Sequence, residues 1–339
     1  MAMTRADLGA APTAAPDRTM VLAAFAAIYL IWGSTYLAIK YAVATVPPFL
    51  MTGARFLIAG GVLYAWSLRA RNRDALQPAP SRSVAREWRD AFVVGSLLIV
   101  AGTALVGWAE QSVPTGITSL VLATTPLWMV LLESATESRR MPRPQVLVGV
   151  VIGLAGLGIL VGPSLASGAK GGSLGIAALV VSALAWSVGA MYSRRIAGKA
   201  SPARSTGMQM IAGALLSLVV SLVVGEHRRV SLAAISLQSA IAVAYLVVAG
   251  ALVGFTAYLW LMRVSTPSRV ATHAYVNPVV AVLLGWAVLA EPVTPRTGVA
   301  MAVIVMAVVL IVSASRWPLS ARLRAVLSFR HGELAQRRS

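Results

Sequence analysis

A permanent positive charge lies inside an apolar stretch near the start of the chain. The run PPFLMTGARFLIAGGVLYAW at residues 47–66 contains Arg55 and no other charged residue. Inside a membrane-spanning segment a cation costs several kcal/mol or more, so we expect Arg55 to have a specific role. Two roles fit this residue type: it ties helix ends or carbonyl groups together, or it binds an anionic group on a solute. The sequence leaves both roles open.

Aromatic and polar side chains recur in other apolar stretches, at spacings that put them on one helix face. Trp32 and Tyr36 lie four residues apart, as do His273 and Asn277, and residues four apart are neighbours on a helix. Such faces can line a solute cavity. The alternatives are anchoring at the membrane interface for the aromatic rings and bonds to own-helix carbonyl groups for the threonines. The residues expected to line the cavity are Trp32, Tyr36, Arg55, Thr103, Trp108, Thr125, Trp186, Tyr192, Gln209, Thr256, His273 and Asn277.

Two prolines come directly after candidate cavity residues, Pro126 after Thr125 and Pro278 after Asn277. Inside a helix, proline removes one backbone hydrogen bond and kinks the helix, which frees a carbonyl group. Each proline can therefore act in gating, form a purely structural kink, or do both.

Glu110 and His273 are the candidates for proton-linked transport. Glu110 shares a helix face with Thr103, but it lies near the end of a predicted span, where solvent would hydrate it. His273 can change charge near neutral pH. The alternative role for His273 is structural, as a neutral ring that is hydrogen-bonded to a neighbouring helix. No Asp or Glu lies deep in any predicted span, which disfavours proton antiport through a deeply buried carboxylate.

The residue inventory argues against several other kinds of chemistry. The chain has no cysteine, which removes disulfides, thiolate catalysis and cysteine-based metal sites. Its three histidines belong to no metal-binding or catalytic motif. We therefore expect no catalytic residue, no metal site and no cofactor, and we expect that the protein is not an enzyme. A membrane scaffold or receptor is the alternative from another class.

The elements that must position these residues are membrane helices. Of 339 residues, 58% are hydrophobic and only 12% are charged, whereas about 25% are charged in globular chains. Many apolar runs are long enough to cross a hydrocarbon core, and helices satisfy their own backbone hydrogen bonds there. The sequence predicts an all-α integral membrane protein with ten transmembrane helices, at 20–40, 48–68, 90–111, 114–134, 144–163, 173–193, 204–225, 236–261, 268–290 and 296–315.

The basic residues indicate the orientation of these spans. With the N-terminus in the cytoplasm, 23 of the 29 Lys and Arg residues fall in cytoplasmic segments, which fits the positive-inside rule. Both termini are therefore predicted to be cytoplasmic, and the net charge of +18 serves topology and headgroup contact rather than nucleic-acid binding. Residues 1–19 are expected to form a disordered tail. Residues 316–339 are expected to form a basic amphipathic tail that lies on the membrane or acts as a stop-transfer signal.

The two halves of the chain repeat each other at an offset of 152 to 154 residues. TGARFL at 52–57 matches TGMQMI at 206–211, Trp32 matches Trp186, and Arg55 matches Gln209. Because each half has an odd number of spans, the halves have opposite orientations. We expect two inverted five-helix repeats, 20–165 and 172–315, around a central cavity. This arrangement favours a transporter that works by alternating access.

Four motifs, in this order, resemble the drug/metabolite transporter superfamily, and most of all its bacterial EamA-type exporters. They are IWGSTYLAIKYAV, PPFLMTGARFLIAGG, WAEQSVPTGITSLVLATTPLW and NPVVAVLLGWAVLAEPVTPRTG, and the resemblance covers roughly residues 20–315. It implies ten helices in two inverted halves, a central cavity, and export of amino acids, other small metabolites or drugs. The first half departs from the NP…AEP…G pattern, so no role of Glu291 is transferred to Glu137.

We therefore expect a secondary transporter that exports small polar metabolites, amino acids above all, across the bacterial inner membrane by alternating access. Export of lipophilic drugs or other metabolites is the alternative. The expected partners are the solute and membrane lipids, with no nucleic acid. A monomer suffices for this function, and a dimer is compatible with it.

Overall fold

The computed structural model describes residues 17–73, 83–133, 135, 144–166, 170–196, 202–265, 270 and 273–316. This part of the chain contains helices and no strand, which confirms the predicted all-α fold. Six of its helical segments are long and apolar enough to cross a membrane, and three shorter apolar helices accompany them. The total of ten spans stays a prediction. Most of the two predicted tails lies outside the described residues; of the described part, α1 already begins at Arg18 and α14 ends at Arg316.

In the first half, proline or a polar cap stands at several helix starts. Asp17 accepts a hydrogen bond from the backbone N–H of Thr19 at 3.0 Å and so caps the first helix. Pro48 begins the second helix, where a missing N–H costs least. The elements are α1 (Arg18–Val43), α2 (Pro48–Arg73), α3 (Val84–Gly95), the π-helix η1 (Ser96–Ala104), α4 (Leu105–Ala109), α5 (Thr115–Leu122), α6 (Thr125–Glu133) and α7 (Pro144–Ala166).

The second half has a similar order, and it too contains a π-helix. Each π-helix lies inside a longer helical segment, η1 between α3 and α4 and η5 between α10 and α11. The elements are α8 (Lys170–Ile196), α9 (Pro202–Val223), the short 3₁₀ turns η3 (Glu226–Arg228) and η4 (Leu232–Ala234), α10 (Leu237–Tyr245), η5 (Leu246–Phe255), α11 (Thr256–Val264), α13 (His273–Leu289) and α14 (Pro295–Arg316).

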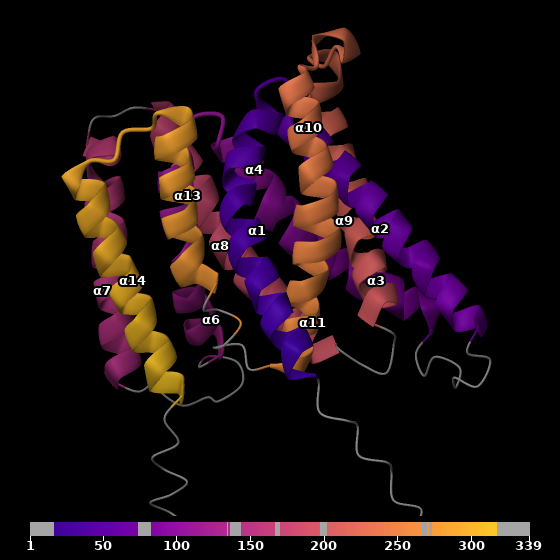
Figure 1. Ribbon diagram of the computed structural model, residues 1–339, viewed down its shortest axis with the longest axis horizontal. Helices are drawn as coiled ribbons and strands as arrows, with labels where there is room; N and C mark the ends of the chain where they lie inside the picture. The colour runs from indigo at the N-terminus through magenta and orange to yellow at the C-terminus, as the bar shows by residue number, and fades with distance from the viewer. Residues whose placement is uncertain are drawn as a thin grey trace, which may run out of the picture.

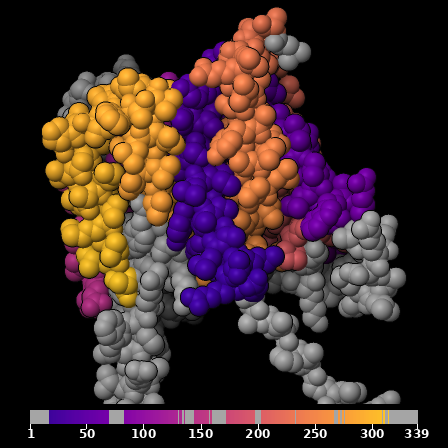
Figure 2. Space-filling model, viewed as in Figure 1, coloured from indigo at the N-terminus to yellow at the C-terminus, as the bar shows by residue number. Residues whose placement is uncertain are grey.

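The helices form one bundle with α1 near its middle (Figure 1). Helices α7 and α14 pack against each other on one side, and α2, α3 and α9 pack together on the other. On the face seen in Figure 2, α13, α1 and the segment from α10 to α11 lie side by side. The start of α1 and the end of α14 lie at the same end of the molecule, the lower end in Figure 1.

Helices α2 and α9 pack closely through small residues. A Cβ atom added to Gly60 would lie 3.0 Å from the carbonyl oxygen of Gly207, and one added to Gly53 would lie 3.2 Å from that of Ala214. Glycine lets helix backbones approach in this way. Shifting Gly53 and Gly60 by the predicted offset of 154 residues gives Gly207 and Ala214. The repeat therefore converts the contact between Gly60 and Gly207 into the contact between Ala214 and Gly53, as a two-fold axis between the helices requires.

The helix predicted at 114–134 is interrupted rather than kinked. Helix α5 ends at Leu122 and α6 begins at Thr125, so Pro126 lies in the first turn of a new helix, where proline is tolerated. The hydroxyls of Thr124 and Thr125 donate to the carbonyl groups of Val121 and Leu122 at 2.7 and 2.6 Å. These bonds satisfy carbonyl groups at the end of α5. In contrast, Pro278 lies inside the continuous helix α13.

Candidate functional site

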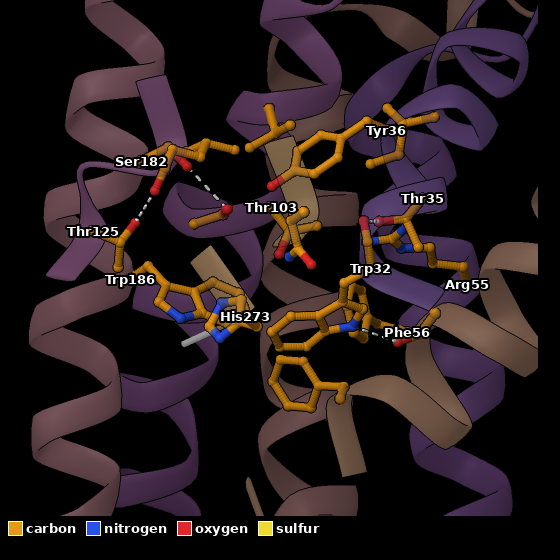
Figure 3. Close-up of a pocket in the computed structure, with 17 residues that line it drawn as sticks. Trp32, Thr35, Tyr36, Arg55, Phe56, Thr103, Thr125, Ser182, Trp186 and His273 are labelled. Atoms are coloured by element: carbon orange, nitrogen blue, oxygen red, sulfur yellow. Dashed lines mark hydrogen bonds between the residues drawn. The ribbon is translucent and has the colours of Figure 1, made fainter. Parts of the chain in front are cut away.

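A cavity of about 110 Å³ lies within the bundle, with room for several water molecules. Residues of α1, α2, η1, α4, α5, α6, α8, η5 and α13 line it. Figure 3 shows Trp186, His273 and Trp32 along one end, Tyr36 at the opposite end and Arg55 at the side. The structure brings together eight of the twelve predicted cavity residues: Trp32, Tyr36, Arg55, Thr103, Thr125, Trp186, His273 and Asn277.

One end of the cavity is aromatic. The ring centroid of Trp32 lies 5.5 Å from that of Trp186, 5.0 Å from that of Tyr258 and 5.4 Å from that of His273. The indole N–H of Trp186 donates to the Tyr258 hydroxyl at 3.1 Å. These contacts hold the rings in a fixed arrangement that can receive an apolar group. The sequence reasoning missed Tyr258, because its spacing links it to no other candidate.

Both π-helices border the cavity. Gly102 and Thr103 of η1 line it, and so does Gly250 of η5. The wider π turn redirects backbone groups: the Trp32 indole N–H donates to the Gly250 carbonyl at 3.4 Å, and the Thr103 hydroxyl donates to the Leu98 carbonyl at 2.8 Å. Single π turns are frequent at functional sites. A sequence signal existed, since VAGTALVG at 100–107 resembles VAGALVG at 248–254.

Arg55 is nearly enclosed, with 5% of its surface exposed. Its guanidinium carbon lies 4.6 Å from the centroid of the Phe56 ring, which is a cation–π distance. The Arg55 Nε atom is buried and has no hydrogen-bond partner among the described residues. A buried donor without a partner is costly, so this N–H can bind an acceptor that enters the cavity.

Glu110 is fully buried, so the expected hydration at a helix end is wrong. Both of its carboxylate oxygens lack a hydrogen-bond partner within the described part of the chain. The carboxylate interacts electrostatically with Lys40, Glu291 and Arg55. The Lys40 ammonium group donates to the backbone carbonyl of Glu110 at 2.5 Å. Glu110 is not among the residues that line the cavity, and helix packing rather than its position along the chain removes it from water.

Trp108 and Tyr192 lie outside the cavity. Trp108 borders a second cavity of about 410 Å³ beside the connection between α1 and α2. The Tyr192 hydroxyl donates to a carboxylate oxygen of Asp90 at 3.2 Å and so joins α8 to α3. The side chains of Trp108 and Tyr192 lie on helix faces that do not point to the first cavity.

Gln209 and Thr256 also lie outside the cavity lining; Gln209 is buried, whereas Thr256 is half-buried with a buried hydroxyl. The Gln209 amide donates to the Ser205 hydroxyl one turn earlier in α9 at 3.2 Å. The Thr256 hydroxyl has no hydrogen-bond partner in the described part of the chain. Shifting Thr103 by 153 residues, within the range of the repeat offset, gives Thr256. The two threonines nevertheless have different local structures, because Thr103 lies inside η1 whereas η5 ends before Thr256.

The two remaining predicted features lie beside the aromatic end. In the orientation that suits its neighbours, the Asn277 amide donates to the carbonyl groups of Tyr29 and His273, each at 3.2 Å. This joins α13 to α1 one residue before Pro278. Pro126 borders a small pocket that also contacts Tyr258 and His273. Among the described residues, no group of three or more His, Asp or Glu side chains is placed to hold a metal ion.

Comparisons with known proteins identify the family. A model described as the EamA-like transporter family matches the chain twice, at residues 18–162 and 173–313. The chain belongs to this family. Its members' name indicates membrane transport, so the chain is a multi-pass membrane transporter that acts on a small-molecule solute. The two matched segments leave out the connection around residue 170 and the two tails.

Relatives support the same assignment. "Uncharacterized inner membrane transporter YedA" of Escherichia coli (strain K12) is 34% identical over 287 residues, which cover 84% of this chain and 88% of the relative. "Uncharacterized transporter YoaV" of Bacillus subtilis is 22% identical and covers 81% of this chain and 90% of the relative. A solved structure described as "Crystal structure of protein" has a TM-score of 0.60 at 24% identity and covers 87% of this chain and 96% of that chain. That last likeness concerns the fold alone.

Proposed function

We propose that this transporter exports small polar metabolites, amino acids above all, across the bacterial inner membrane by alternating access. The observation that carries this proposal is Arg55. Its charge and its unpartnered buried N–H lie on a cavity inside an apolar bundle, where a solute carboxylate is a suitable partner because charged hydrogen bonds are strong in such surroundings.

The rest of the lining supports a solute with a polar end and an apolar part. The hydroxyl groups of Tyr36 and Thr103 lie on the cavity with Arg55, and they can bind polar groups of the solute. The rings of Trp32 and Trp186 can receive an apolar side chain. An amino acid combines these two features in a molecule that is small enough for a cavity of about 110 Å³.

Alternating access is supported by three features. The family model matches two successive segments of similar length. The two glycine contacts between α2 and α9 are equivalent to each other when the repeat offset is applied. Helix α5 stops and α6 begins beside the cavity, and interrupted helices are common at the substrate sites of transporters built from inverted repeats.

The aromatic end also favours a second candidate function, the export of lipophilic drugs. Four rings cluster there, and the centroids of neighbouring rings lie less than 6 Å apart. The rings are those of Trp32, Trp186, Tyr258 and His273. Such a surface binds flat apolar molecules without any need for Arg55. The two candidates therefore differ in whether Arg55 is required.

Efflux from proteoliposomes tests the proposal. Vesicles loaded with a mixed amino-acid pool are followed for efflux with and without a pH gradient, and a parallel set is loaded with a lipophilic cationic dye. Amino-acid efflux that Trp32→Ala abolishes would support the proposal and its cavity. Absence of efflux for every amino acid would refute the leading function, and dye efflux alone would favour the drug exporter.

A further inference from the structure

Two helix ends in the second half share an unusual local structure. Among the described residues, Gly225 and Ala290 have positive φ angles, 77° and 54°. Gly225 follows α9 and Ala290 follows α13, and a left-handed residue at this position ends a helix. In both cases the next residue is a glutamate, Glu226 or Glu291. For alanine the left-handed conformation is strained, and such strain persists where the surrounding structure requires it.

Glu226 caps the start of α2. Its carboxylate oxygens accept hydrogen bonds from the backbone N–H groups of Phe49 and Leu50 at 3.2 and 2.8 Å. The side chain is buried, with 4% of the residue exposed. The Ser217 hydroxyl of α9 also donates to the Phe49 carbonyl at 2.8 Å. The carboxylate therefore neutralises the positive end of α2 from a residue far away in the sequence.

Glu291 caps the start of α5 in the same way. Its two carboxylate oxygens accept from the backbone N–H groups of Thr115 and Gly116 at 2.9 and 3.2 Å. Gly285 of α13 makes room for this carboxylate, because a Cβ atom there would lie 2.6 Å from Oε2 of Glu291. The backbone N–H of Glu291 also donates to the Gly285 carbonyl at 3.1 Å.

The two caps follow one rule. In the predicted repeat, α9 is the counterpart of α2, and the predicted span 268–290, which contains α13, is the counterpart of the predicted span 114–134, which begins with α5. Each glutamate follows one span and caps the start of the counterpart of that span. In all four hydrogen bonds a backbone N–H of the first half donates to a carboxylate of the second half. The segments after α9 and after α13 also lie at one end of the molecule, the upper end in Figure 1.

We propose that Glu226 and Glu291 are paired positioning residues that hold the two halves together at this end, and that their release opens the cavity there. The inference rests on the proposed alternating access. Hydrogen bonds that a carboxylate accepts from the backbone N–H groups at a helix start are strong, so the upper end stays closed while these bonds last. The lower end has a different tie, an ion pair at 2.9 Å between Glu87 of α3 and Arg204 of α9. The two ends can therefore open separately.

The absence of native cysteine makes this proposal directly testable. A single reporter is introduced as Val106→Cys, because Val106 lines the cavity and is 4% exposed. A second protein with only Gln111→Cys, an exposed position next to Glu110, marks the membrane side that the upper end faces. Labelling by a membrane-impermeant maleimide is measured from each side, in right-side-out and in inside-out membrane vesicles that are prepared without solute.

Glu226→Gln and Glu291→Gln are each combined with the Val106→Cys reporter. Each is expected to raise the labelling rate from the side marked by Gln111→Cys by about fivefold, which corresponds to ~1 kcal/mol. The matched control is Glu87→Gln, which breaks the tie at the other end and is expected to leave labelling from the marked side unchanged or lower. Glu226→Asp and Glu291→Asp keep the carboxylate on a side chain that is one methylene group shorter, and are expected to give a smaller rise in the labelling rate.

Folding is checked with a Met210→Cys reporter in the same variants, since Met210 is fully buried and labels only in an unfolded chain. Labelling of the Val106→Cys reporter that stays equal to the parent in both Glu→Gln variants would overturn the proposal. So would an equal rise from both sides, or a rise accompanied by labelling at Met210→Cys. The assay contains no solute, so its outcome is independent of whether amino acids are exported.

Discussion

Arg55 provides the sharpest test of the cavity, because its two roles make different predictions. We consider Arg55→Met, which keeps much of the side-chain length and removes the charge. The Nε atom is buried without a partner, and leaving such a donor unpaired costs roughly 1–3 kcal/mol. Removing it should therefore leave the free energy of unfolding unchanged or raise it. If Arg55 tied helices together, the same substitution would lower that free energy.

The effect on transport is expected to be large. A hydrogen bond to a charged group contributes roughly 1.5–3 kcal/mol, so loss of the Arg55–carboxylate contact should weaken apparent solute affinity by about 10- to 100-fold. Efflux from proteoliposomes is measured over a range of internal amino-acid concentrations, and thermal unfolding is measured in detergent. We expect a raised half-saturation concentration together with an unchanged melting temperature.

Arg55→Lys is the matched control. It keeps the charge but loses the planar fork of donors that suits a carboxylate, so its half-saturation concentration should fall between those of the parent and Arg55→Met. Unchanged half-saturation in Arg55→Met would refute the assignment of Arg55 to the solute. A melting temperature that drops in both variants would instead assign it to helix packing.

Three further substitutions test features of the fold outside the cavity lining. Gly60→Leu should lower the free energy of unfolding by about 1–3 kcal/mol, because the Gly207 carbonyl lies 3.0 Å from the added Cβ; an unchanged melting temperature would contradict the α2–α9 contact. Ala290→Gly should raise the melting temperature, because glycine removes a left-handed strain of roughly 1–2 kcal/mol at φ 54°; a fall would show that the strain is absent. Glu110→Gln should keep the fold, since its carboxylate oxygens have no hydrogen-bond partner among the described residues; unfolding would show that its charge balances Lys40 and Arg55.

Much of the fold could be predicted from local sequence features. Helix α2 begins at Pro48, as predicted, and α1 begins two residues before its predicted start. Such agreement is possible because an apolar run and a proline affect the conformation of the backbone close to them in the chain. The same reasoning could not find the break between α5 and α6, because a proline that kinks one helix and a proline that begins another have the same sequence pattern.

The candidate site was predictable in part. Helical spacing on α1 and α13 correctly put Trp32 with Tyr36 and His273 with Asn277 on the cavity. It failed for faces whose direction is decided by neighbours, as with Trp108 beside the second cavity. The repeat offset also misled for Thr256, because the π-helices shift the register differently in the two halves.

By itself the sequence determined that this chain is a helical membrane protein of two similar halves, with a charge and several rings inside the membrane. Apolar run length, charge placement and repeated motifs are properties of the chain that need no contact to be recognised. Only the tertiary structure decided that Glu110 is buried and that Glu226 and Glu291 cap α2 and α5. Those facts depend on backbone N–H groups and side chains more than 170 residues apart in the chain, and no local pattern specifies which of them meet.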